Sequence, residues 1–210
     1  MRLHLASGNA HKAAEFAALA AAARLAVEIV PATAVGGMPA VVEDATTFSG
    51  NARKKARALQ ARLPAGSWVL ADDSGLGVAE LGGAPGVESA YFAGPQGDSA
   101  ANLRKLVETM RDVPEGRRQA YFACVLIVID AKGIEYEFEG RCDGALRMTP
   151  RGRAGFGYDP LFVPAGLSLT FAELPEAAKN AISHRGLAWT RLAAWLRSRE
   201  EPKPTPGTAT

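Results

Sequence analysis

The sequence predicts an α/β fold built on a long mixed β-sheet flanked by helices. Short apolar runs alternate with helical patterns along most of the chain, which is typical of a sheet that is at least partly parallel. Two long apolar runs in the second half are separated only by residues 131–133, which predicts an antiparallel hairpin and therefore a mixed sheet. The expected strands are 2–6, 27–31, 68–71, 120–130 and 134–141, and the expected helices are 10–24, 47–63, 99–110 and 183–199.

Local patterns support these elements in chain order. The first strand breaks at 7–9, and Asn9 is a suitable N-cap for the helix that follows. An apolar stripe at about 100° per residue marks helix 47–63, and strand 68–71 is a short apolar run that leads into two carboxylates. The hairpin strands are unusually long, and Ser183 is a natural N-cap for the last helix.

Composition indicates an ordinary globular protein. The chain has 210 residues, 48% of them hydrophobic and 22% charged, which excludes a wholly disordered, collagen-like or disulfide-scaffold protein. We expect residues 1–199 to form a single domain and residues 200–210, rich in Pro and Thr, to form a disordered tail. The 24 basic and 22 acidic residues give a net charge of +2, which argues against a dedicated polyanion binder, so no nucleic acid partner is expected.

The cysteines and the apolar runs indicate the cellular setting. Cys124 and Cys142 form no Cys-x-x-Cys pair and have no nearby histidine, so reduced thiols are expected rather than a zinc or thioredoxin-like site. The N-terminal stretch lacks the hydrophobic region of a signal peptide, and the longest apolar run, 120–129, is half a membrane span. We therefore expect a soluble, cytoplasmic protein with no membrane partner.

The first candidate site is the segment Ser7-Gly8-Asn9-Ala10-His11-Lys12. It follows a strand and opens a helix, where free backbone N–H groups and the helix dipole favour an anion. Lys12 would lie in the first turn, where a cation opposes the dipole, so a phosphate between them would explain its placement. A solvated surface lysine is the alternative.

Lys55 is the second candidate because it lies on an apolar helix stripe. It follows Phe48 by seven positions, which at about 100° per residue returns it to the same face, whereas Lys54 projects away. A lysine that points toward the core either binds an anion or extends its charged end to the edge of the core.

The third candidate is the run Asp72-Asp73-Ser74-Gly75, which we expect to form a glycine turn at the end of strand 68–71. Strand ends in α/β sheets are common ligand sites. If strand geometry continued, Asp72 and Asp73 would point to opposite faces, so one would act and the other would support it. Glu43 with Asp73 would suffice for Mg²⁺, which is held by one or two carboxylates plus substrate phosphates. A turn without function is the alternative.

Two later segments could recognise a base. Phe156-Gly157-Tyr158-Asp159 puts two aromatic rings and a carboxylate on a glycine-hinged loop, which could stack on a nucleobase and accept from its ring N–H groups, or could be a packed turn. Lys179, His184 and Arg185 could form a donor cluster for ring oxygens or phosphates, or could be a solvated basic helix start.

Together these motifs resemble, in order and spacing, the noncanonical purine nucleoside triphosphate pyrophosphatases, also called inosine triphosphate pyrophosphatases. The resemblance spans nearly the whole chain. The matching motifs are Ser-x-Asn-x-x-Lys at 7–12, Thr47-Phe48, Asn51-Ala52, Lys55-Ala56, the runs 71–76, 81–87 and 155–160, and Ser183-His184-Arg185-Gly186. Many members carry an acid at the position of Gly50 and an arginine at that of Tyr91, so this chain departs from them at both.

The resemblance implies a two-lobed fold with a central cleft, a homodimer, and Mg²⁺-dependent hydrolysis of ITP, dITP and XTP between the α- and β-phosphates, giving monophosphate and pyrophosphate. It places Ser7, Gly8, Asn9, Ala10, His11, Lys12 and Lys55 on the phosphates, Glu43 and Asp73 on the metal, and Asp73 also as general base. It places Ser74 against substrate and Phe156, Gly157, Tyr158, Asp159, Lys179, His184 and Arg185 around the purine, with Phe156 stacking and His184 and Arg185 donating to the 6-oxo group.

Other functions compete with this hypothesis. A nucleotide sensor would keep the pocket without turnover, although the intact Asp73 and Glu43 speak against it. A pyrophosphatase for modified pyrimidine triphosphates, as in the related Maf-like enzymes, would keep the chemistry and change the base. A kinase or transferase ranks last because the chain has no Walker loop or kinase signature.

Overall fold

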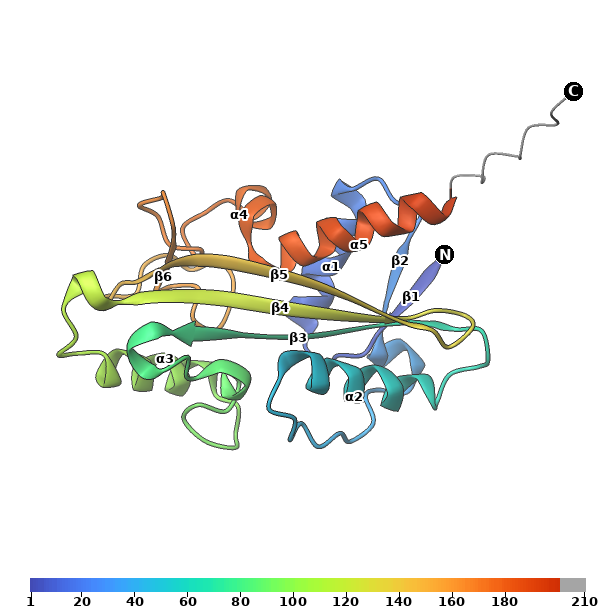
Figure 1. Ribbon diagram of the computed structural model, residues 1–210, viewed down its shortest axis with the longest axis horizontal. Helices are drawn as coiled ribbons and strands as arrows, with labels where there is room; N and C mark the ends of the chain where they lie inside the picture. Colours follow the sequence, from blue (N-terminus) through green and yellow to red (C-terminus); the bar gives the residue numbers. More distant parts are fainter. Residues whose placement is uncertain (201–210) are drawn as a thin grey trace, which may run out of the picture.

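A six-stranded mixed sheet forms the centre of the fold in the computed structural model, which describes residues 1–200 (Figure 1). The strands are β1 (Arg2–Leu5), β2 (Glu28–Pro31), β3 (Trp68–Val78), β4 (Gln119–Ile129), β5 (Glu135–Leu146) and β6 (Phe162–Pro164). They lie in the order β2-β1-β3-β4-β5-β6, with β1 parallel to β2 and β3 and the remaining pairs antiparallel. The predicted α/β class, mixed sheet and long hairpin are confirmed.

Helices cover both faces of this sheet. Figure 1 shows α1, α4 and α5 on one side of the long strands and α2 and α3 on the other. Their bounds are α1 (Ala10–Ala22), α2 (Phe48–Gln60), α3 (Ser99–Thr109), α4 (Glu176–Ile182) and α5 (His184–Glu200). The predicted tail began at residue 200, but this residue belongs to α5. The rest of the predicted tail lies outside the described residues. None of the helices described is long and apolar enough to cross a membrane.

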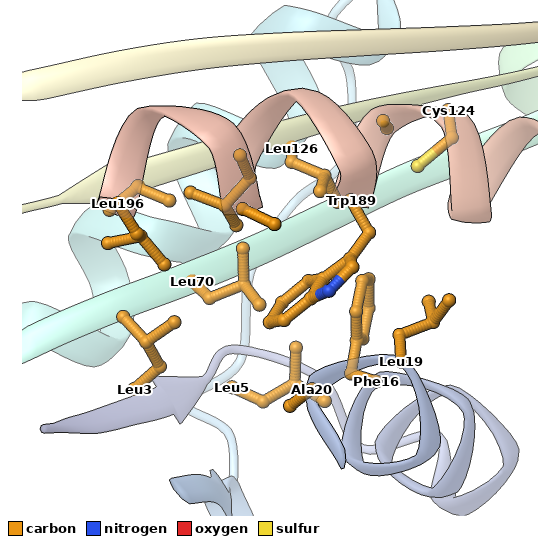
Figure 2. Packing of buried hydrophobic residues seen from close by; sticks show 14 residues of the cluster. Leu3, Leu5, Phe16, Leu19, Ala20, Leu70, Cys124, Leu126, Trp189 and Leu196 are labelled. Carbon is orange, nitrogen blue, oxygen red and sulfur yellow. The ribbon is translucent and has the colours of Figure 1, made fainter. Parts of the chain in front are cut away.

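A buried aromatic pair fixes α5 against α1. Trp189 and Phe16 lie with ring centroids 5.8 Å apart, and both are buried among the leucines of β1 and β3 (Figure 2). Each ring lies one helical turn after a candidate site residue, because Lys12 precedes Phe16 by four positions and Arg185 precedes Trp189 by four. Core packing thus places the starts of both helices over the middle of the sheet.

The turn expected at 72–75 is wrong, because β3 continues without a break to Val78. Strand β4 pairs with this whole stretch, placing Asp72 opposite Leu126 and Asp73 opposite Val125. Gly75 serves close packing rather than a turn, since a Cβ there would lie 2.3 Å from the carbonyl oxygen of Gly86. Asp72 and Asp73 therefore lie on opposite faces of a continuous strand.

The N-caps expected from the sequence are confirmed. The Asn9 side chain accepts from the backbone N–H groups of His11 and Lys12 at the start of α1, and the Ser183 hydroxyl accepts from that of Gly186 at 3.1 Å. Strand β6 and helix α4 were not expected, because three and seven residues are too short to show a period. Both cysteines are free and buried.

Candidate active site

A cleft of about 430 Å³ opens beside the middle of β3 and gathers most of the predicted site residues. Among its lining residues are the predicted Ser7, Gly8, Asn9, Lys12, Glu43, Lys55, Ser74, Phe156, Gly157, Tyr158, Asp159, Lys179, His184 and Arg185. Ala10 and His11 are outside this lining, and Asp73 is buried at its edge, in contact with Lys55. Segments far apart in sequence thus form one concave surface.

The start of α1 forms one end of the cleft. Asn9 Oδ1 accepts from the backbone N–H groups of His11 at 2.9 Å and Lys12 at 3.2 Å, and Ser7 Oγ accepts from that of Asn9 at 3.1 Å. These contacts fix the turn and commit the amides of His11 and Lys12 to the cap. Lys12 is not a solvated surface lysine, because its ammonium group pairs with Asp72.

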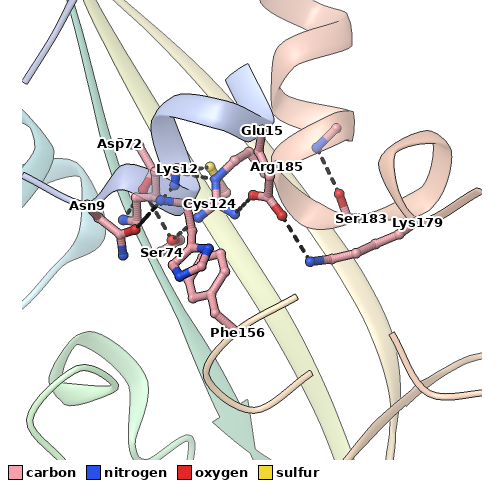
Figure 3. Close-up of polar contacts among 12 residues, drawn as sticks. Asn9, Lys12, Glu15, Asp72, Ser74, Cys124, Phe156, Lys179, Ser183 and Arg185 are labelled. Atoms are coloured by element: carbon pink, nitrogen blue, oxygen red, sulfur yellow. Dashed lines mark hydrogen bonds and ion pairs between the residues drawn. The ribbon is translucent and has the colours of Figure 1, made fainter. Parts of the chain in front are cut away.

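Asp72 is the buried anion around which the cleft floor is organised. Its side chain has no exposed surface and accepts from Lys12 Nζ, Arg185 Nε at 3.2 Å, Cys124 Sγ at 3.1 Å and Ser74 Oγ at 3.3 Å (Figure 3). Burial alone would raise the pKa of this carboxyl, but Arg185 and then Lys12 hold it well below its usual value. Asp72 is therefore an ionised counter-ion to both cations.

Glu15 extends this network and was missed in the sequence. It lies one turn after Lys12 on α1, accepts from Lys179 Nζ at 2.9 Å and pairs with Arg185 Nη1 (Figure 3). Lys179 also donates to Asp159 Oδ2 at 2.8 Å, and Arg185 Nη2 donates to Ser74 Oγ at 2.9 Å. Alternating charges therefore run from the start of α1 to the 156–159 loop. The signal available in the sequence was that Glu15 follows Lys12 by three positions, which places both side chains on the same face of the helix.

Lys55 lies between the two carboxylates predicted to hold metal. Its Nζ is 2.6 Å from Asp73 Oδ1 and 2.9 Å from Glu43 Oε2, and it belongs to the buried stripe of α2, as predicted. Burial lowers the pKa of Lys55, but attraction to Asp73 and Glu43 outweighs burial and raises it. For Asp73 burial dominates, so its pKa is raised despite Lys55. Lys54, by contrast, pairs with Asp44 in solvent.

The chemistry of these two carboxylates suits a divalent cation whose remaining ligands come from outside the protein. Within residues 1–200, no group of three or more His, Cys, Asp or Glu side chains could hold a metal. Mg²⁺ needs only one or two carboxylates when phosphates and water complete its shell. The second oxygen of Asp73, Oδ2, is buried without a hydrogen-bond partner among the described residues, which leaves a lone pair available to a cation.

The 156–159 loop lines the cleft beside the start of α1. Phe156 stacks on His11 with ring centroids 5.5 Å apart and an interplanar angle of 19°. Tyr158 is instead buried and donates its hydroxyl to the carbonyl of Ser89 at 2.9 Å, so it anchors the loop. Asp159 accepts from the backbone N–H of Phe156 at 2.9 Å as well as from Lys179, so its carboxylate is already engaged; burial raises its pKa, an effect that Lys179 partly offsets.

His184 is a neutral imidazole in this cleft. It stacks on Phe122 with ring centroids 4.6 Å apart and an interplanar angle of 11°. Burial, and then the neighbouring Arg185, depress its pKa well below the usual value. Its Nδ1 is buried without a hydrogen-bond partner among the described residues, so it is available to a ligand or an internal water.

Several lining residues have no signature in the sequence. Met38, Pro39 and Val41 form one part of the lining, and Ala90 and Tyr91 another. Buried asparagines hold the neighbouring loops: Asn51 Oδ1 accepts from the backbone N–H of Ala45 at 3.0 Å, and Asn102 Nδ2 donates to the carbonyl of Ala90 at 2.8 Å. At Gly50, a Cβ would lie 2.6 Å from that of Ala45, so an acid there would require the Glu43 loop to shift.

Known proteins are similar to this chain in sequence and in structure. A family model described as the Ham1 family matches residues 3–195. A protein from Opitutus terrae named dITP/XTP pyrophosphatase is 63% identical over 201 residues, covering 94% of this chain and 99% of the relative. A HAM1 protein structure from Coxiella burnetii aligns with a TM-score of 0.82 at 36% identity, covering 94% of this chain and 99% of that one. A Mycobacterium abscessus structure titled nucleoside-triphosphatase and dITP/XTP pyrophosphatase aligns with a TM-score of 0.71 at 41% identity, covering 91% and 98%.

Proposed function

Because this chain belongs to the Ham1 family, we propose that it hydrolyses the noncanonical purine triphosphates ITP, dITP and XTP to their monophosphates and pyrophosphate. The observation that carries the proposal is the single cleft, which has Lys12 and Lys55 with two carboxylates in one part and an aromatic ring with donors in another. A nucleotide has the same division into phosphates and base. The names of the Opitutus and Mycobacterium relatives support this substrate class.

Asp73 is the proposed general base. Its Oδ2 is buried without a hydrogen-bond partner among the described residues, so it has a lone pair with which to accept a proton from water. Glu43 and Asp73 would hold Mg²⁺, which when bound offsets phosphate charge during displacement at the α-phosphorus. Asp73 would orient water and take its proton as the water oxygen bonds to the α-phosphorus. The bond from that phosphorus to the oxygen that bridges the α- and β-phosphates breaks, and pyrophosphate leaves.

The lysines provide electrostatic stabilisation at the phosphates. Attack at the α-phosphorus builds negative charge on oxygens that already repel an anion, so fixed cations lower the barrier. Lys12 is held on the capped first turn of α1 and Lys55 on the buried stripe of α2. With the amides of His11 and Lys12 taken by Asn9 and Ala10 outside the cleft lining, the remaining contacts would come from Ser7, Gly8 and the lysine ammonium groups.

Donors around the base support discrimination between purines. Lys179 and Arg185 are cationic donors, and the neutral His184 offers one further N–H. A 6-oxo group accepts from such donors, whereas the 6-amino group of adenine leaves them unpaired, a mismatch that costs far more than a lost apolar contact. Phe156 would leave His11 to stack on the purine. Asp159 would act through Lys179 and the loop backbone.

The assembly and setting of the enzyme remain part of the proposal. We propose a single two-lobed domain with the cleft between the lobes, working as a cytoplasmic homodimer on free nucleotides rather than on nucleic acid. The near balance of 24 basic and 22 acidic residues supports a small-molecule substrate over a polyanion. Sedimentation analysis of the full chain would measure the dimer directly.

A substrate panel tests the proposed function. ITP, dITP, XTP, GTP, ATP and a modified pyrimidine triphosphate are incubated with Mg²⁺ and enzyme, and products are separated by anion exchange. Monophosphate and pyrophosphate should form from ITP, dITP and XTP with kcat/KM about 10⁴-fold above that for ATP, the size of discrimination that unpaired buried donors give. Orthophosphate as the first product, or preference for the pyrimidine, would refute the assignment, and binding without turnover would indicate a sensor.

A further inference from the structure

We propose that Lys55 excludes a free divalent cation from the Glu43–Asp73 pair, so that metal enters the site only together with the nucleotide. Lys55 Nζ lies within 2.9 Å of an oxygen of each carboxylate and so occupies the space between them. The same two carboxylates are the proposed metal ligands. A cation that bridges them must therefore displace the ammonium group or share the space with it.

Sharing is electrostatically unfavourable. Two carboxylates carry two negative charges, of which Lys55 already compensates one. A divalent ion added beside Lys55 would put three positive charges against two negative ones in a region where Lys55 and Asp73 are buried. Repulsion between close like charges is strong where water is largely excluded.

Displacement is equally unfavourable while the cleft holds no anion. The backbone of Lys55 is fixed, because Ala52, Ala56 and Leu59 on the same stripe of α2 are buried against β3 and β4. Only the flexible four-carbon side chain can move, and a buried ammonium group that loses both carboxylates needs another anion. Phosphates of a nucleotide bound in the cleft, which Lys55 lines, would supply that anion.

Metal and nucleotide should therefore bind with positive coupling. Phosphates would draw Lys55 away from Asp73 and Glu43, so that the oxygens it vacates join the already unpartnered Asp73 Oδ2 as ligands for the metal. Because coupling is reciprocal, each of the two ligands strengthens binding of the other. The inference rests on the proposed function for the identity of the anion and for the two metal ligands.

The test is a titration of the full-length, nucleotide-free protein with Mn²⁺, an ion that prefers oxygen ligands as Mg²⁺ does. The electron paramagnetic resonance signal of free Mn²⁺ measures how much of the ion is bound. Lys55→Met should bind one Mn²⁺ at least about tenfold more tightly than the wild type, an order-of-magnitude estimate from removal of one close positive charge. Lys54→Met is the matched control, because its partner Asp44 is exposed and lies outside the cleft lining, and it should leave Mn²⁺ affinity unchanged. The double variant Lys55→Met with Glu43→Gln should lose the gain, which locates the ion.

Equal Mn²⁺ affinity in Lys55→Met and the wild type would overturn the inference, as would tight stoichiometric binding to this pair in the wild type without nucleotide. Lys55→Gln provides the same comparison if Lys55→Met does not fold, and the wild-type titration alone decides if neither does. No turnover is measured, so failure of this experiment is distinct from failure of the substrate panel. If the wild-type protein is a pyrophosphatase but binds metal before nucleotide, only the role given to Lys55 is contradicted.

Discussion

Replacing Asp72 by asparagine should destabilise the protein severely. The side chain is fully buried and serves as counter-ion to Lys12 and Arg185 at once. Asparagine keeps the shape but removes the charge, leaving the buried Arg185 and the partly buried Lys12 short of an anion. Breaking a buried pair in this way costs about 3–5 kcal/mol, a large part of the roughly 5–15 kcal/mol by which domains are stable.

Urea denaturation at pH 7 measures this cost, and Asp143→Asn is the control. Asp143 pairs with Arg141 at 2.7 Å, but the two side chains are 64% and 56% exposed, so its loss should cost no more than about 1 kcal/mol. Acid titration adds a second readout. The folded pKa of Asp72 is depressed, so its stabilisation is complete above the unfolded pKa near 3.8 and is lost as pH falls below that value. Asp72→Asn should remove this acid dependence. Equal costs of about 1 kcal/mol for both variants would refute the reasoning.

Three further predictions follow from other parts of the molecule. The pKa of His184 is depressed in the folded protein, so the unfolded chain takes up a proton at a higher pH and the free energy of unfolding falls as pH drops below about 6.5. His184→Phe should reduce the pH dependence of the unfolding free energy by up to about 1.4 kcal/mol per pH unit, measured by denaturation between pH 5 and 6.5. An unchanged pH dependence would show that the imidazole is not buried in its neutral form. Phe156→Ala should raise the KM for ITP by about tenfold, because stacking on a base contributes about 1–3 kcal/mol. Phe138→Ala, remote from the cleft, controls for general effects on the fold. An unchanged KM in Phe156→Ala would place the base elsewhere. Trp189→Ala should lower the unfolding free energy by about 3–5 kcal/mol, because the Trp189 side chain is buried against Phe16. It should also weaken activity, because Trp189 supports α5 one turn after Arg185. Full activity in the folded variant would show that Arg185 is positioned independently of Trp189.

Features set by local geometry were predictable from the sequence. Asn9 and Ser183 cap their helices because a short polar side chain next to an apolar pattern satisfies free N–H groups in any tertiary context. Lys55 faces inward because helical periodicity alone directs it there. The opposite orientation of Asp72 and Asp73 followed from strand alternation once the strand was known to continue.

Features that depend on distant partners were not predictable. Strand β3 continues through Asp72 and Gly75 because β4, about 50 residues later in the chain, supplies the hydrogen bonds. Glu15 joins the network because Lys179 and Arg185, more than 160 positions later in the chain, approach it in the fold. From the sequence, the Asp159 carboxylate was predicted to accept hydrogen bonds from a nucleobase. In the fold it accepts instead from Lys179 and from the backbone N–H of Phe156.

The most direct test of the account is hydrolysis of ITP with Mg²⁺ in ¹⁸O-labelled water, followed by ³¹P nuclear magnetic resonance. Asp73 is proposed to deliver water to the α-phosphorus, so one ¹⁸O atom should appear in the phosphate of inosine monophosphate while pyrophosphate stays unlabelled. Asp73→Asn should abolish most of this turnover, since the amide cannot take the proton of water. Label in pyrophosphate, label in orthophosphate, or full turnover in Asp73→Asn would contradict the proposed mechanism.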